Sequence, residues 1–65
     1  MLFAEKIKKL RKKLDLSQSH FAVMLGVSQS SVACWETGIT ECSPPVRERL
    51  KKVCDINHIR ISWRK

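Results

Sequence analysis

Residues 17–38 read SQSHFAVMLGVSQSSVACWETG and contain two short helical patterns joined by a glycine. Ser17 and Ser28 precede these patterns and are suited to cap them, because a serine hydroxyl accepts a hydrogen bond from a first-turn backbone N–H. Gly26 falls between the patterns, where a left-handed backbone conformation lets the chain reverse. We therefore expect one helix from Gln18 to the Gly26 turn and a second over about 29–37, crossing steeply as in a helix-turn-helix.

Apolar residues at helical spacing give each expected helix one buried face. The same spacing predicts a helix over residues 2–14. It also predicts a helix that starts at Ser43-Pro44-Pro45 and ends near Cys54. The predicted core residues are Phe3, Ile7, Leu10, Leu14, Phe21, Ala22, Leu25, Val32, Trp35, Val46, Leu50, Val53 and Cys54. The sequence predicts one all-α domain over residues 1–55, followed by a tail over 56–65.

The charge is unevenly distributed along the chain. The 65 residues carry a formal net charge of +7 from 13 Lys and Arg and six Asp and Glu, yet no Lys or Arg occurs from Leu14 to Val46. If the middle of the chain contacts DNA, it reads bases with neutral side chains, while the flanks neutralise phosphates. The alternative is that the lysine-rich helices are simply solvated faces.

Several classes of function lack their sequence signals. The three cysteines, Cys34, Cys42 and Cys54, do not have the spacing of a zinc site, so we expect reduced thiols, no metal and no cofactor. No carboxylate pair, glycine-rich phosphate loop or cysteine–histidine constellation suggests an enzyme. No apolar run is long enough to cross a membrane and no signal peptide is present, so we expect a cytoplasmic protein.

The motifs together resemble a known family, the lambda-repressor-like, XRE/Cro-type helix-turn-helix proteins of bacteria and phages. The resemblance covers roughly residues 3–54 and implies a four- to five-helix domain that binds double-stranded DNA. It is carried by Ile7, Leu10, Arg11, Leu16-Ser17-Gln18, Phe21-Ala22, Leu25-Gly26-Val27-Ser28, Val32, Trp35-Glu36, Gly38 and Leu50.

The resemblance implies roles for individual residues. The helix over 29–37 becomes the recognition helix, with Gln29 suited to pair with an adenine edge. Arg11 is expected to form an ion pair with Glu36. The expected base-reading residues are Gln29, Ser30, Ser31 and Cys34, and the expected phosphate-binding residues are Gln18, Arg11, Ser28, Thr40 and Lys9. Each of these could instead be an ordinary polar surface residue.

Residues 58–64 alternate polar and apolar residues with a period of two, which favours a strand. We expect this segment to pair antiparallel with its copy in a second subunit, so that Ile59, Ile61 and Trp63 form a dimer interface. A fifth helix, a tail folded onto its own domain and a disordered tail are the alternatives.

The sequence therefore predicts a sequence-specific transcription regulator that represses by occupying a palindromic operator as a homodimer. Phage repressors, mobile-element regulators and restriction–modification controllers are all of this type. The alternative is an antitoxin-like interaction module of the same fold, which would hold a protein partner through Val23, Met24 and the tail.

Overall fold

The computed structural model describes residues 2–63 and shows four helices in this range, with no strand among these residues. They are α1 (Phe3–Lys13), α2 (Gln18–Leu25), α3 (Gln29–Thr37) and α4 (Pro44–Ile56). The all-α prediction is confirmed. The bounds of α3 are those predicted, α1 is one residue shorter at each end, and α4 runs to Ile56 rather than Cys54.

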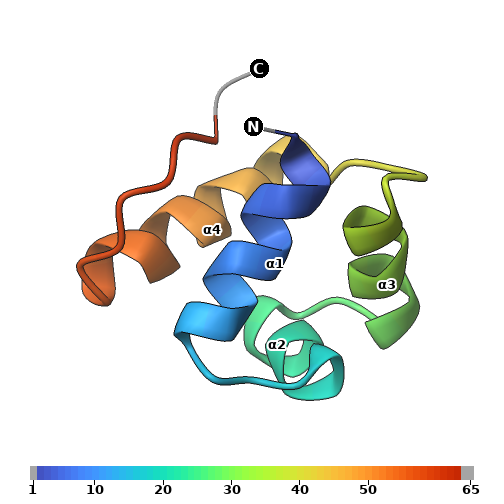
Figure 1. The fold of residues 1–65 in the computed structure, drawn as a ribbon, viewed down its shortest axis with the longest axis horizontal. Coiled ribbons are helices and arrows are strands. Elements are labelled where there is room, and N and C mark those ends of the chain that lie inside the picture. Colours follow the sequence, from blue (N-terminus) through green and yellow to red (C-terminus); the bar gives the residue numbers. More distant parts are fainter. Residues whose placement is uncertain (1, 64–65) are drawn as a thin grey trace.

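The helices surround a single core (Figure 1). α2 and α3 pack against each other, α1 packs against α3, and α2 contacts α4. Every helix contributes fully buried side chains; the largest are Phe21, Ile7, Leu10, Leu25, Leu50 and Val32. Burying a side chain of this size contributes about 1.5–3 kcal/mol each, so these residues supply most of the driving force for folding.

Serine side chains cap the N-terminal ends of α2 and α3. The Ser17 hydroxyl accepts from the His20 N–H at 3.1 Å, and the Ser28 hydroxyl accepts from the Ser31 N–H at 3.2 Å, as predicted. Ser43 is the N-cap residue of α4 and proline follows it, as predicted, but the Ser43 side chain makes no cap hydrogen bond. Pro44 and Pro45 occupy the first two helical positions and have no N–H, so Val46 is the first residue of α4 with an N–H to donate, and it makes no bond to the Ser43 hydroxyl.

A residue with left-handed backbone conformation follows each of the four helices within two positions. Gly26 (φ 72°) and Gly38 (φ 83°) follow α2 and α3, as their sequence positions predicted. Asp15 and His58, both with φ 56°, play the same part after α1 and α4. After α4 the Ile59 N–H donates to the Cys54 carbonyl at 2.8 Å, which is the bond of a Schellman motif.

His58→Gly should therefore raise the free energy of unfolding by about 0.5–1 kcal/mol, because glycine removes the left-handed strain at some cost in unfolded-state entropy. Urea unfolding followed by circular dichroism measures the change. Gly38→Ala is the matched control, since an added Cβ meets no atom within 4 Å and only the backbone term is altered. It should be destabilising by a similar amount; a His58→Gly protein no more stable than the parent would contradict this account.

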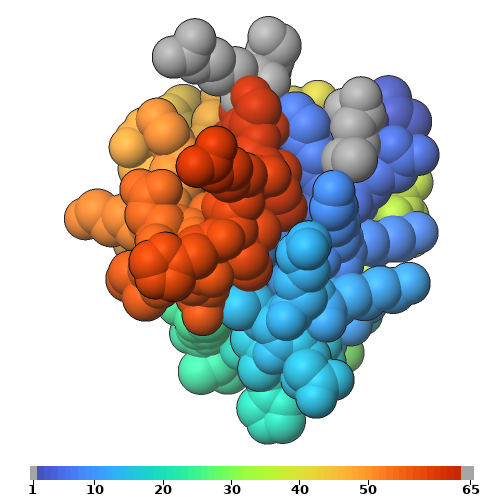
Figure 2. Space-filling model, turned by 60° about the vertical axis from the view of Figure 1, so that its left-hand side comes forward, coloured from blue at the N-terminus to red at the C-terminus, as the bar shows by residue number. Residues whose placement is uncertain are grey.

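The tail differs from the predicted dimerisation strand. Residues 57–63 form no strand and instead lie against their own domain, between α1 and α4 (Figure 2). Ile59 and Ile61 are half-buried and Trp63 is 5% exposed, whereas His58, Arg60 and Ser62 between them are exposed. The alternation thus reports an extended segment with one buried face, and the surface that covers this face belongs to the same chain. The rest of the predicted segment, residues 64–65, lies outside the described range.

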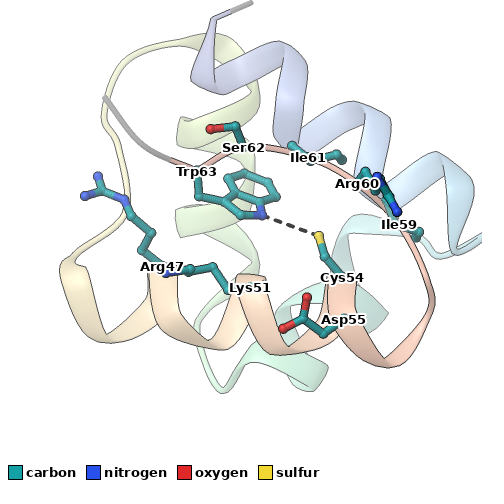
Figure 3. Close-up of a pocket in the computed structure, with 9 residues that line it drawn as sticks. All are labelled: Arg47, Lys51, Cys54, Asp55, Ile59, Arg60, Ile61, Ser62 and Trp63. Atoms are coloured by element: carbon teal, nitrogen blue, oxygen red, sulfur yellow. Dashed lines mark hydrogen bonds between the residues drawn. The ribbon is translucent and has the colours of Figure 1, made fainter.

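Aromatic contacts fix the tail to the core. The Phe3 ring lies between Trp35 and Trp63, with ring centroids 6.3 Å and 6.0 Å away and edge-to-face geometry. The Trp63 Nε1–H donates to the Cys54 Sγ at 3.4 Å (Figure 3). These contacts make Trp63 part of the same core as α1, α3 and α4.

Candidate nucleic-acid interface

The outward face of α3 is small and uncharged. Val32, Trp35 and Glu36 are buried, so the opposite side of the helix faces solvent. Of the four predicted base-reading residues, Gln29 and Ser30 are exposed, whereas Ser31 and Cys34 are half-buried. The Ser31 hydroxyl also lies 3.0 Å from that of Ser28. Gln29 and Ser30, at the N-terminal end of α3, are therefore the most accessible of the four.

Sequence reasoning missed two residues on this face, Ala33 and Thr37. Helical spacing places Ser30, Ala33, Cys34 and Thr37 on one side of α3 and would have identified both. Thr37 is exposed, and its hydroxyl lies 3.0 Å from the Ala33 carbonyl and 3.1 Å from that of Cys34, to which it donates. Its oxygen lone pairs remain able to accept a hydrogen bond from a base or a water.

Arg11 and Glu36 lie in contact and tie α1 to α3. Arg11 Nε donates to Glu36 Oε2 at 2.6 Å and Nη2 donates to Oε1 at 3.0 Å, a bidentate arrangement. Arg11 Nη1 donates to the Leu16 carbonyl at 3.0 Å, before α2 begins. The Gln18 amide donates to Glu36 Oε1 at 3.3 Å. These bonds fix the start of α2 relative to α3, and we call Arg11, Gln18 and Glu36 the helix clamp.

The electrostatics of the helix clamp keep Glu36 ionised. Burial of this side chain, which is 4% exposed, acts to raise its pKa. The hydrogen bonds from Arg11 and Gln18, with the positive charges of Arg11 and Lys8, outweigh burial and hold the pKa of Glu36 below its ordinary value. The hydrogen bond to Glu36 in turn raises the pKa of Arg11. Both partners are therefore charged at neutral pH.

The predicted phosphate-binding residues do not all lie together. Arg11 and Gln18 belong to the helix clamp, Ser28 caps the adjacent helix, and Thr40 is exposed in the loop after α3. Lys9 lies elsewhere: two residues before Arg11, it points about 160° away around α1 and lines a surface hollow with Arg60 of the tail.

A second arginine supports the helix-turn-helix from the other side. Arg49 Nη1, on α4, donates to the Leu25 carbonyl at 2.7 Å. This carbonyl is one of the unsatisfied acceptors at the C-terminal end of α2, where a positive charge also favours the helix dipole. A Cβ at Gly26 would lie 3.2 Å from the same Arg49 nitrogen, so the turn between α2 and α3 leaves little room for a side chain.

Other candidate sites are limited. Val23 and Met24 are 77% and 43% exposed on α2. Among residues 2–63 no group of three or more His, Cys, Asp or Glu side chains could hold a metal ion. All three cysteines are free, and burial raises the pKa of the Cys42 and Cys54 thiols. No helix in this range has both the length and the apolar character needed to span a bilayer.

This arrangement defines a helix-turn-helix protein: two short helices joined by a glycine turn, with the second presenting an exposed polar face. A helix-turn-helix family model matches residues 7–63, and the chain belongs to this family, of the XRE or lambda-repressor-like type. The family consists of DNA-binding transcription regulators rather than enzymes, and the chain is a regulator of this type. Comparisons with curated proteins and with solved structures gave no match.

Proposed function

We propose that the protein is a repressor that occupies a palindromic operator as a homodimer, with α3 of each subunit in the major groove. The observation that carries the proposal is the helix clamp. It holds the start of α2 against α3 while leaving Gln29 and Ser30 exposed at the N-terminal end of the recognition helix. A repressor has to reach its operator on bacterial or phage DNA, so we propose that the protein acts in the bacterial cytoplasm.

Base reading in this proposal depends on short, neutral side chains. Gln29 can donate to and accept from an adenine edge at once, and Ser30 is short enough to let the helix approach closely. Ser31 and Cys34 lie further along the helix, where Cys34 can contact a thymine methyl group. Because this face has no Lys or Arg, its contribution is sequence discrimination rather than charge neutralisation.

Phosphate binding is assigned to the residues around the helix clamp. Gln18 and Ser28 stand at the beginnings of α2 and α3, where backbone N–H groups favour an anion. The Arg11 guanidinium, 20% exposed, adds a fixed positive charge, and Thr40 can donate from the loop. Lys8 is the α1 lysine whose charge acts on Glu36, so it replaces Lys9 in this role.

Gln29→Ala and Gln18→Ala should have different effects on DNA binding. Loss of Gln29 should relax the preference at one position per half-site by about 1–3 kcal/mol. Loss of Gln18 should weaken binding to all sequences alike, because a phosphate contact carries no sequence information. Affinities for every single-base variant of a preferred duplex measure both effects. An unaltered preference in Gln29→Ala would show that another residue reads this position.

The homodimer is proposed to form on the operator. Because Trp63 is buried in its own domain, an interface made by Ile59, Ile61 and Trp63 would require the tail to leave that domain. Two recognition helices on one face of the duplex need half-sites about 34–36 Å apart. Sedimentation of the protein with a palindromic duplex and with a single half-site tests this. One protein per palindrome would exclude the dimer.

A second candidate is an interaction module that uses α2. Val23 and Met24 form adjacent exposed apolar side chains on a small domain, which favours a protein partner. Val23→Ser combined with Met24→Ser should leave DNA binding unchanged and abolish a complex with such a partner. A loss of DNA binding by a folded double variant would place these residues in the DNA-binding or dimer surface instead.

A further inference from the structure

One side of α1 and the tail form a basic surface that faces away from the recognition helix. Lys6, Lys9 and Lys13 are spaced by three and four residues and so lie on one side of α1. Arg60 of the tail lies beside them, because Lys6, Lys9 and Arg60 line one shallow hollow. Lys9 and Lys13 line the neighbouring hollow together with Glu5, Lys8 and Lys12. We call Lys6, Lys9, Lys13 and Arg60 the α1–tail basic strip; Figure 2 shows α1 and the tail side by side on this face.

Among residues 2–63 no cation of the α1–tail basic strip forms an ion pair, and Glu5 is the one acidic residue that lines its hollows. The ion pairs among residues 2–63 use Arg11, Arg47 and Lys51 as their cations. Like charges three or four residues apart destabilise a helix by about 0.2–0.5 kcal/mol per pair. The strip therefore costs folding stability that a bound polyanion would restore.

The strip cannot share a straight duplex with α3. Arg11 contacts Glu36, which lies on the buried side of α3, so this side of α1 faces α3 and the core. Lys9 and Lys13 flank Arg11 by two residues on either side, and each points about 160° away from it around the helix. A duplex seated on α3 thus leaves the α1–tail basic strip uncovered.

The dimensions and composition of the strip fit the backbone of duplex DNA. Seven residues of helix separate Lys6 from Lys13, about 10 Å along the axis. One strand of a duplex presents about three phosphates over this length. No aromatic side chain is exposed between the four cations, so the strip offers no surface on which unpaired bases could stack. Leu2 is the exposed apolar side chain near the strip, and one such side chain buries too little apolar area to anchor the protein in a membrane.

We propose that the α1–tail basic strip binds the sugar–phosphate backbone of a second segment of duplex DNA, without regard to sequence. One protein molecule then holds its operator and a neighbouring stretch of DNA together. The operator half of this inference rests on the proposed function, whereas the backbone binding of the strip does not.

The test uses two duplexes, one containing the preferred operator and labelled with a donor dye, the other of random sequence and labelled with an acceptor. The full chain should bring them together, giving energy transfer at near-physiological salt. Lys9→Gln combined with Lys13→Gln should reduce this transfer at least tenfold while changing operator affinity less than threefold. Its matched control is Lys51→Gln combined with Lys52→Gln, which removes the same charge from α4 and should leave the transfer unchanged.

A second measurement follows the random duplex alone. For this duplex the double variant on α1 should lower the slope of log affinity against log salt by about 2, because each lost phosphate contact contributes about 0.9. Acylation of lysines with and without the random duplex should show protection of Lys6, Lys9 and Lys13. If the random duplex protects these lysines but the protein prefers no operator sequence, the proposed function is refuted and the binding of DNA backbone by the strip is supported.

Three results would overturn the inference. The first is the absence of energy transfer with a wild-type protein that binds its operator. The second is an equal loss of transfer in the α1 and α4 variants, which would show a non-specific effect of net charge. The third is protection of these lysines by anionic phospholipid vesicles but not by duplex DNA, which would make the strip a membrane surface.

Discussion

Replacing Trp63 with alanine should lower the free energy of unfolding by about 3–5 kcal/mol, the range for removing a large aromatic side chain from a core. Trp63 is 5% exposed, packs edge-to-face against Phe3 and donates a hydrogen bond to Cys54. A domain of this size has a total stability of only about 3–10 kcal/mol. The variant should therefore be marginally folded or unfolded at room temperature.

Urea unfolding followed by far-ultraviolet circular dichroism measures this effect. Ile56→Ala is the control, because Ile56 is a large apolar residue that is 77% exposed, and its loss should change stability by less than about 0.5 kcal/mol. Truncation after Asn57 removes Ile59, Ile61 and Trp63 together and should also unfold the domain. A truncated protein that stays folded would contradict the role given to the tail and revive the dimerisation strand.

Arg11→Ala should lower the free energy of unfolding by about 3 kcal/mol, at the low end of the range for breaking a buried ion pair because Arg11 is 20% exposed. The loss leaves Glu36 charged, buried and without its bidentate partner. Arg11→Lys should recover only part of the loss, since an ammonium cannot form the two parallel bonds. In a double-mutant cycle with Glu36→Ala, the double variant should be less destabilised than the sum of the single variants.

The same ion pair predicts an acid sensitivity. Because the pKa of Glu36 is lower in the folded protein, its stabilising effect is complete above the unfolded value, about 4.3, and is lost as pH falls toward the folded pKa. Glu36→Gln should remove this part of the pH dependence. Parallel stability curves for the wild type and Glu36→Gln below pH 5 would contradict the assigned shift.

The helix-turn-helix itself was predictable from local signals. Ser17, Ser28, Gly26 and Gly38 are residue types with strong preferences for the caps and turns at which they occur, so the bounds of α3 were correct. These signals act within a few residues and need no knowledge of the rest of the chain.

The ends of α1 and α4 were less predictable. Asp15 and His58 adopt left-handed conformations, which are uncommon for any residue with a side chain, although Asp and His adopt them more often than most. At both positions the chain has to turn so that the following apolar residue, Leu16 or Ile59, can pack against the core. Tertiary packing decides these conformations, which is why composition alone did not reveal them.

The tail shows another limit of sequence reasoning. Its period-two pattern correctly indicated an extended segment with one buried face, but periodicity does not state what covers that face. Here the groove between α1 and α4 does so, with Trp63 against Phe3. The resemblance also implied a phosphate-binding role for Lys9; we propose Lys8 in its place, because three residues before Arg11 it lies closer than Lys9 to the Arg11 side of α1.

The most direct test of the account is selection of bound sequences from a random duplex pool at near-physiological salt, using the full chain. Contacts to phosphates alone lose much of their affinity under these conditions, so the sequences retained report base reading. The account predicts an enriched palindrome whose half-sites are one helical turn apart. A folded protein that enriches no sequence would contradict base reading by α3.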